Sequence, residues 1–303
     1  FMNFKEIVND IGSKAKKESI KLRTLNADKK KIAYERLEEN INNKAKDILK
    51  ANEIDIENAV NNNLAKPLIN RLKLNENTIS SIIKSIAEIK NQIDPIGKIL
   101  EEWSQPNGLK FSKISVPLGV LGVIYESRPN VTVDASCLAL KSNNALILRG
   151  GSDSFETSKE LIKIITTSFK EAQLPDDIVQ MIPTTDREAV DCLLAMDNYV
   201  NVIIPRGGKS LIKKINDKSR IPVIKHLEGL CHIYVDKEAN LNIAKKIIFN
   251  SKLRRPEICG AAETLLIDKD IKNNAIGLIK PLYDAGCIIR GDSFIKSLDP
   301  NFE

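Results

Sequence analysis

One of the five cysteines lies in a segment that could make it a nucleophile. Cys259 follows Arg254 and Arg255 in neither a helical nor a strand pattern, and a glycine and two alanines come after it. Arginines favour a thiolate if they fold toward it, and small neighbours leave space around the sulfur. The other cysteines lie in apolar patterns typical of buried thiols, within helical stretches (Cys137, Cys192) or opening strand-like ones (Cys231, Cys287). From the residues alone, Cys259 is either a reactive thiol or one more buried one.

Two short turns have the composition of an anion-binding site. They read Arg149-Gly150-Gly151-Ser152 and Pro205-Arg206-Gly207-Gly208-Lys209, each between an apolar run and a helical stretch. Glycines let backbone N–H groups approach a phosphate, and the N-terminus of the following helix attracts the anion. Because both turns carry an arginine, we predict a dinucleotide or another phosphate-rich ligand there.

A third apolar run ends in Glu126-Ser127-Arg128-Pro129-Asn130. Pro129 keeps Arg128 out of the helical region, which leaves Asn130 at the entrance to the next helix. The Asn130 amide could cap that helix, which is the simpler interpretation, or it could donate to a developing oxyanion. Both roles stay open.

Missing motifs exclude several other chemistries. The sequence has no G-x-G-x-x-G, no Walker A motif and no G-x-S-x-G elbow. Its two histidines, His226 and His232, have no zinc-site spacing to the cysteines, so we expect no metal. The net charge of +6 comes from lysines interleaved with glutamates, which indicates solvated helix faces rather than nucleic-acid binding. Widely spaced cysteines and the lack of a signal-peptide pattern or a long apolar run predict a cytoplasmic protein away from membranes.

The elements that must position these residues follow from the hydrophobic period. Helical repeats fill the first ninety-odd residues. The turn residues 105–108 predict a hairpin over 98–116, with a bulge near Ser112-Lys113 because the apolar positions change parity there. From residue 117 to 227, strands and helices alternate, which predicts a doubly wound parallel sheet with ligands at the carboxyl ends of its strands. A second α/β unit begins near His226, has a last strand at 287–291, and is expected to be incomplete because no closing element precedes Glu303.

Five stretches in this order resemble the gamma-glutamyl phosphate reductase family of the aldehyde dehydrogenase superfamily. They are VPLGVLGVIYESRPNVTVDA, ALILRGGSDS, VIIPRGG, IPVIKHLEGLCHIYVD and RRPEICGAAETLLI. The resemblance implies an aldehyde-dehydrogenase-like α/β fold in which residues 1–97 and 117–225 form an NADP-binding domain. Residues 98–116 would form an oligomerisation hairpin, and residues 226–303 the N-terminal part of a catalytic domain.

The resemblance also implies a reaction and the residues that perform it. NADPH would reduce L-glutamyl 5-phosphate to L-glutamate 5-semialdehyde and phosphate through a thioester on Cys259, in proline biosynthesis. Asn130 matches the oxyanion amide. Residues matched to the cofactor site are Ser127, Arg128, Pro129, Arg149, Gly150, Gly151, Ser152, Pro205, Arg206, Gly207, Gly208, Lys209 and Glu228. Arg254 and Arg255 are assigned to the substrate phosphate.

Glu228 falls where an oxidising relative keeps a base that activates water. It could serve as that base or only hold a backbone turn, and we prefer the second role because efficient reduction disfavours a positioned water. Two alternatives to the reductase remain: a CoA-acylating member of the superfamily, or a truncated, non-catalytic member that only binds nucleotide. Expected partners are a second copy of the chain, as a dimer or tetramer, and a glutamate 5-kinase.

Overall fold

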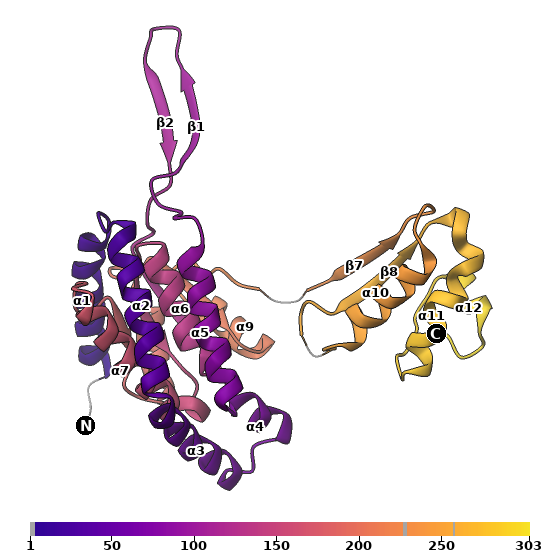
Figure 1. Ribbon diagram of the computed structural model, residues 1–303, viewed down its shortest axis with the longest axis horizontal. Coiled ribbons are helices and arrows are strands. Elements are labelled where there is room, and N and C mark those ends of the chain that lie inside the picture. The colour runs from indigo at the N-terminus through magenta and orange to yellow at the C-terminus, as the bar shows by residue number, and fades with distance from the viewer. Residues whose placement is uncertain (1–3, 227–228, 257) are drawn as a thin grey trace. The chain divides into compact units, whose positions relative to one another are not determined.

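The computed structural model describes residues 4–226, 229–256 and 258–303. The chain separates into two compact units, Phe1–Lys225 and His226–Glu303, which are described one at a time (Figure 1). In the described part of the chain, no helix combines the length and the apolar character needed to cross a membrane.

The first unit begins with helices that bury apolar stripes at helical spacing. Helix α5 shows why they form: Asn75 accepts from the N–H of Thr78 in a reciprocal capping box, and Ile79, Ile82 and Ile86 are buried behind it. The predicted helical start of the chain is thus present. Its helices are α1 (Phe4–Leu22), α2 (Ala27–Asn43), α3 (Ala45–Asn61), α4 (Lys66–Leu72) and α5 (Glu76–Asn91).

A four-stranded parallel sheet forms the centre of the first unit. Its order is β5-β4-β3-β6, from β3 (Val120–Tyr125), β4 (Ala145–Arg149), β5 (Val179–Met181) and β6 (Val202–Arg206). All six residues of β3 are buried, as expected for a parallel strand covered on both faces. The strand predicted at 221–227 is reduced to a single bridge, Val223 to Ile203, and Leu227 lies outside the described residues.

Helices cover both faces of this sheet. Helix α6 (Asn130–Lys141) packs against β3 and β4, α7 (Phe155–Glu171) packs against β5 and α6, and α2, α3 and α5 form a further layer over these two helices. Helix α1 contacts β3, β4 and β5 and packs against α8 (Arg187–Leu194), whereas α9 (Lys209–Lys218) follows β6. The predicted doubly wound arrangement is therefore present.

The predicted hairpin is present and projects from the first unit (Figure 1). Strands β1 (Ile99–Ser104) and β2 (Lys110–Ile114) pair antiparallel, and every residue in both is exposed. The bulge was predicted on the wrong strand. Ile99 pairs with Ile114, and Glu101 pairs with Lys113. Leu100, which lies between them, has no partner in β2, so β1 carries the extra residue.

The second unit is a small α/β layer. Strands β7 (Cys231–Val235) and β8 (Ala262–Ile267) pair in parallel and are connected through α10 (Leu241–Leu253); α11 (Ala275–Asp284) and α12 (Ser293–Leu298) follow β8. The strand predicted at 287–291 is wrong, and Cys287 opens no strand. Instead, Ile289 and Gly291 share two backbone hydrogen bonds with Glu303, of 2.8 and 2.9 Å, which is too short a pairing for a strand.

Candidate active site

The three predicted turns of the first unit meet at one edge of the sheet. Because β4, β3 and β6 are neighbours and parallel, their carboxyl ends lie side by side. Direct contacts join the turns: Ser127 Oγ donates to Asp153, and the Glu126 N–H donates to the Arg206 carbonyl at 3.1 Å. Residues from three separate parts of the chain thus form one cluster, which we call the strand-end cluster (residues 126–130, 149–153 and 205–209).

Close packing explains the small residues of this cluster. A Cβ atom at Gly207 would lie 2.6 Å from Glu126 Oε2, and one at Gly150 would lie 3.0 Å from the hydroxyl of Tyr125. Ser127 is buried with φ +44°, a left-handed conformation that costs free energy for a residue with a Cβ. The chain therefore turns sharply directly after β3.

Arg149 is a half-buried cation that bonds to main chain rather than to a carboxylate. Its guanidinium donates to the carbonyls of Gly150 (2.8 Å) and Thr185 (2.7 Å), and its buried Nε has no partner within the described chain. Burial, followed by the charge of Arg187, lowers the pKa of Arg149. An anion beside this guanidinium would offset the cost of burying its charge.

Glu126 was missed by the sequence analysis, which assigned it no role. Its carboxylate accepts from the N–H of Gly208 at 3.0 Å, and Gly208 is the N-cap of α9. The helix N-terminus predicted to bind phosphate therefore already binds a carboxylate. A signal existed in the sequence, since an acidic residue directly after a buried strand stands at the ligand edge of a parallel sheet.

Asn130 does not cap the helix, so that interpretation is wrong. Pro129 is the N-cap residue of α6, and Asn130 is the first helical residue, without a capping hydrogen bond. Its amide nitrogen instead donates to Asp134 Oδ2 at 3.2 Å, one turn further along. The amide stays half-buried at the rim of the strand-end cluster.

The remaining predicted residues of the cluster have simpler positions. Arg128 and Arg206 are exposed, and Ser152 Oγ bonds to Asp153 at 3.2 Å. Pro205 is buried within β6, and Lys209 is the first residue of α9. Glu228 lies outside the described residues.

In the second unit, Cys259 lies in a turn between α10 and β8 and is exposed. The other four cysteines, all described, are buried or half-buried. The Cys259 carbonyl accepts from Cys231 Sγ at 3.4 Å, and a Cβ atom at Gly229 would overlap the same carbonyl oxygen. The backbone of the turn thus packs directly against the segment before β7. Arg254 and Arg255, at the end of α10, are exposed.

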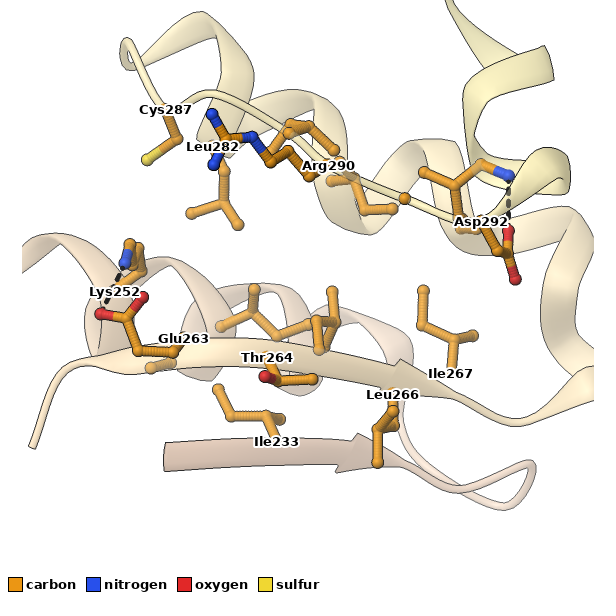
Figure 2. Close-up of a pocket in the computed structure, with 18 of the residues that line it drawn as sticks. Ile233, Lys252, Glu263, Thr264, Leu266, Ile267, Leu282, Cys287, Arg290 and Asp292 are labelled. Atoms are coloured by element: carbon orange, nitrogen blue, oxygen red, sulfur yellow. Dashed lines mark hydrogen bonds and ion pairs between the residues drawn. The ribbon is translucent and has the colours of Figure 1, made fainter. Parts of the chain in front are cut away.

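The second unit also contains a cavity that Cys259 does not line. It has a volume of about 900 Å³ and lies between β8 and residues 287–292, as Figure 2 shows. Aliphatic side chains such as Ile233 and Leu266 dominate its lining, and its nearby charges are partly paired, with Lys252 3.2 Å from Glu263. None of the predicted site residues that the structure describes lines this cavity.

Comparison with known proteins gives three results. The profile of the aldehyde dehydrogenase family matches residues 13–284. The gamma-glutamyl phosphate reductase of Bartonella bacilliformis is 46% identical over 293 residues, which cover 96% of this chain and 71% of that one. The crystal structure of gamma-glutamyl phosphate reductase from Thermotoga maritima superposes with a TM-score of 0.89 at 35% identity, covering 97% of this chain and 72% of that one.

A more distant structure shares the fold alone. An engineered glycolyl-CoA reductase with bound NADP+ superposes with a TM-score of 0.63 at 16% identity, over 94% of this chain and 60% of that one. The described chain therefore has the aldehyde dehydrogenase fold, and its sequence is far more similar to the acyl-phosphate reductases than to this acyl-CoA reductase.

Proposed function

Because the chain belongs to the aldehyde dehydrogenase family and, within it, to the gamma-glutamyl phosphate reductases, we propose that it reduces L-glutamyl 5-phosphate to L-glutamate 5-semialdehyde with NADPH, in proline biosynthesis. The observation that carries this proposal is the 46% identity over 293 residues to a gamma-glutamyl phosphate reductase. The exposed Cys259 in its turn before β8 supports it. The CoA-acylating alternative has only fold-level likeness behind it.

The strand-end cluster fits a nicotinamide dinucleotide. Arg149 Nε, which has no hydrogen-bond partner among the described residues, and the N–H of Gly208, which binds a carboxylate, are both donors suited to phosphate oxygens. We assign Arg149 to Ser152 to the adenosine ribose and its 2′-phosphate, which favours NADPH, and Pro205 to Lys209 to the pyrophosphate. We also assign Ser127 to Pro129 and Glu228 to the cofactor site. When bound, the cofactor supplies the hydride that reduces the acyl carbon.

Cys259 acts as the nucleophile in this proposal. Its thiolate attacks the acyl carbon, a carbon–sulfur bond forms, and the bond to the phosphate oxygen breaks, so that phosphate leaves with the electron pair. After reduction, collapse of the thiohemiacetal breaks the carbon–sulfur bond and restores the thiolate. The exposed position of Cys259 suits attack on a substrate from solution, and exposed Arg254 and Arg255 offer positive charge for the phosphate.

Asn130 stabilises the tetrahedral oxyanion in this proposal. Its half-buried amide carries two N–H groups, of which Asp134 takes one. A donor of this kind contributes on the order of 3 kcal/mol to the transition state. A backbone N–H beside Cys259 would supply a second donor.

The hairpin is the proposed oligomerisation element. Trp103 and Phe111 stack with ring centroids 5.4 Å apart, yet both are exposed, as are Ile99, Leu109 and Ile114. Apolar side chains gathered on a projecting hairpin are typical of a contact surface. We further propose a cytoplasmic location, which keeps Cys259 reduced, and a glutamate 5-kinase partner that delivers the labile acyl phosphate.

The test is NADP+ reduction by glutamate semialdehyde, with and without phosphate. Wild type should turn over only with phosphate, and Cys259→Ser should lose turnover while binding NADPH as wild type does. Turnover that depends on CoA instead would identify the acylating alternative. Full activity in Cys259→Ser would reject the nucleophile.

A further inference from the structure

The first turn of α6 joins Asn130 to a carboxylate. Asn130 and Asp134 are four residues apart and so lie on the same face of the helix. The amide Nδ2 of Asn130 donates to Asp134 Oδ2 at 3.2 Å. Because Pro129 is the N-cap residue, this side chain is not engaged in capping and is available for another role.

The carboxylate determines which end of the amide faces it. An ionised carboxylate only accepts hydrogen bonds, whereas an amide has an NH2 end that donates and an oxygen end that accepts. Asp134 therefore selects the rotamer in which the nitrogen of Asn130 faces it. One N–H is used in this contact and the second N–H on the same nitrogen remains for a ligand.

Asp134 is itself held from a neighbouring helix. Ser85 Oγ, on α5, donates to Asp134 Oδ1 at 3.0 Å, while Oδ2 accepts from Asn130. Asp134 is half-buried where α5 and α6 pack together. The hydrogen bonds Ser85 to Asp134 and Asn130 to Asp134 therefore fix the carboxylate at both oxygens.

We propose that Asp134 is a positioning residue that holds Asn130 with its amide nitrogen, rather than its oxygen, toward the acyl oxygen of the substrate. This inference rests on the proposed function, since it requires Asn130 to be the oxyanion donor. A carboxylate that accepts one N–H makes the remaining N–H a slightly weaker donor. The contribution of Asp134 is therefore orientation before the reaction, which is the main source of oxyanion stabilisation.

The main test is Asp134→Asn, which has nearly the same shape but can donate. Its NH2 can bond the oxygen of Asn130 and turn that amide over, so kcat should fall about tenfold while KM and the dissociation constant of NADPH stay within twofold. Asp134→Ala, which removes the acceptor without offering a donor, should lose less. The matched control is Asp191→Asn on α8, which loses an ion pair to Lys218 (2.8 Å) and should keep wild-type kcat.

A double-mutant cycle separates orientation from general structural damage. In an Asn130→Ala background, Asp134→Asn should cause no further loss of kcat, since there is no amide left to orient. An equal loss in both backgrounds would overturn the inference. If Asn130→Ala loses activity but Asp134→Asn does not, the inference fails and the oxyanion role stands.

Two further variants, Asn130→Ala alone and Ser85→Ala, can also overturn the inference. If Asn130→Ala keeps wild-type kcat, the oxyanion role fails and the inference fails with it. If Asp134→Asn does not fold, Ser85→Ala tests the same chain of hydrogen bonds from its outer end. It should lower kcat about threefold without changing NADPH binding, and unchanged kcat would overturn the inference.

Discussion

The two units differ in how they hold their functional residues. In the first, β3 is buried along its whole length and one large core supports the strand-end cluster. In the second, every residue of β7 and β8 except Val235 is exposed or half-buried, and the apolar residues form two small clusters. The comparison teaches that the proposed cofactor site is fixed by a core and by contacts between its own turns. The proposed nucleophile, Cys259, is held by a few local backbone contacts.

We expect the largest effect from a substitution that breaks those local contacts. Gly229→Ala places a Cβ where the Cys259 carbonyl oxygen lies, so the backbone of the turn that carries Cys259 must move. Displacing a reacting group by about 1 Å costs on the order of 100-fold in rate. We expect such a loss in kcat, measured by semialdehyde oxidation, with unchanged NADPH binding. Gly260→Ala is the control because the nearest atom to its Cβ is 3.9 Å away. Weakened NADPH binding in Gly229→Ala would contradict the prediction that the turn of Cys259 is held independently of the proposed cofactor site.

The next prediction concerns the stability of the first unit. Asp55 is buried and accepts from the N–H of Glu156 (3.1 Å) and from the N–H and hydroxyl of Thr157 (2.8 and 2.6 Å), at the start of α7. Asp55→Ala should lower the free energy of unfolding by about 2–3 kcal/mol, because it leaves buried donors without an acceptor. Urea titration measures this. Asp55→Asn keeps one acceptor and should lose less; equal losses would show that packing, not hydrogen bonding, is the cause.

The third prediction concerns the role of Arg149 in NADPH binding at the proposed cofactor site. Arg149→Met keeps the length of the side chain but removes the charged donors, and should weaken NADPH binding by about tenfold or more. NADH, which lacks the 2′-phosphate, should bind within twofold of wild type. Fluorescence titration of both cofactors checks this. Equal weakening for NADPH and NADH would mean that Arg149 acts by holding the carbonyls of Gly150 and Thr185 instead.

A smaller effect is expected at Glu126, in the opposite direction. Its carboxylate occupies the Gly208 N–H that we assign to the pyrophosphate and repels that anion. Glu126→Gln should bind NADPH about fivefold tighter, since a like charge a few ångströms away costs roughly 1 kcal/mol near water. Glu160→Gln, which loses a 3.6 Å ion pair with Lys163, is the control. Weaker binding in Glu126→Gln would show that the carboxylate supports the site.

The smallest effect is spectroscopic and belongs to the second unit. The Tyr234 hydroxyl donates to Asp268 at 2.7 Å, and this hydrogen bond raises the pKa of Tyr234 to about 12. Because the folded pKa lies above the unfolded one near 10, the stabilisation is present below about pH 10 and is lost as pH rises through 12. Tyrosinate absorbance follows the titration, and Asp268→Asn should return the pKa of Tyr234 toward 10. An unchanged titration curve would assign the late step to another tyrosine.

Local sequence patterns predicted the elements but not the contacts between them. The helical spacing of its isoleucines predicted α5, and glycine and proline residues indicated the three turns at the strand ends. The roles of Glu126 and Asp134 depend on which turns and helices become neighbours, and no local pattern carries that information. The strand expected at 287–291 failed for a related reason. An apolar run indicates burial, and Ile289 is half-buried beside Leu282 without a neighbouring strand.

The buried polar contacts of the N-terminal helices have a consequence for folding during synthesis. Lys30 bonds to Asn143 (2.7 Å), Tyr34 to the Cys137 carbonyl (2.9 Å) and Asp55 to Thr157, across 113, 103 and 102 residues. A ribosome adds about 5–20 residues per second, so these side chains wait roughly 5–20 s for their partners. During that time the helices cannot bury a lysine, a phenol and a carboxylate. Helices α2 and α3 therefore depend on α6 and α7, the later helices that they cover, to complete their own fold.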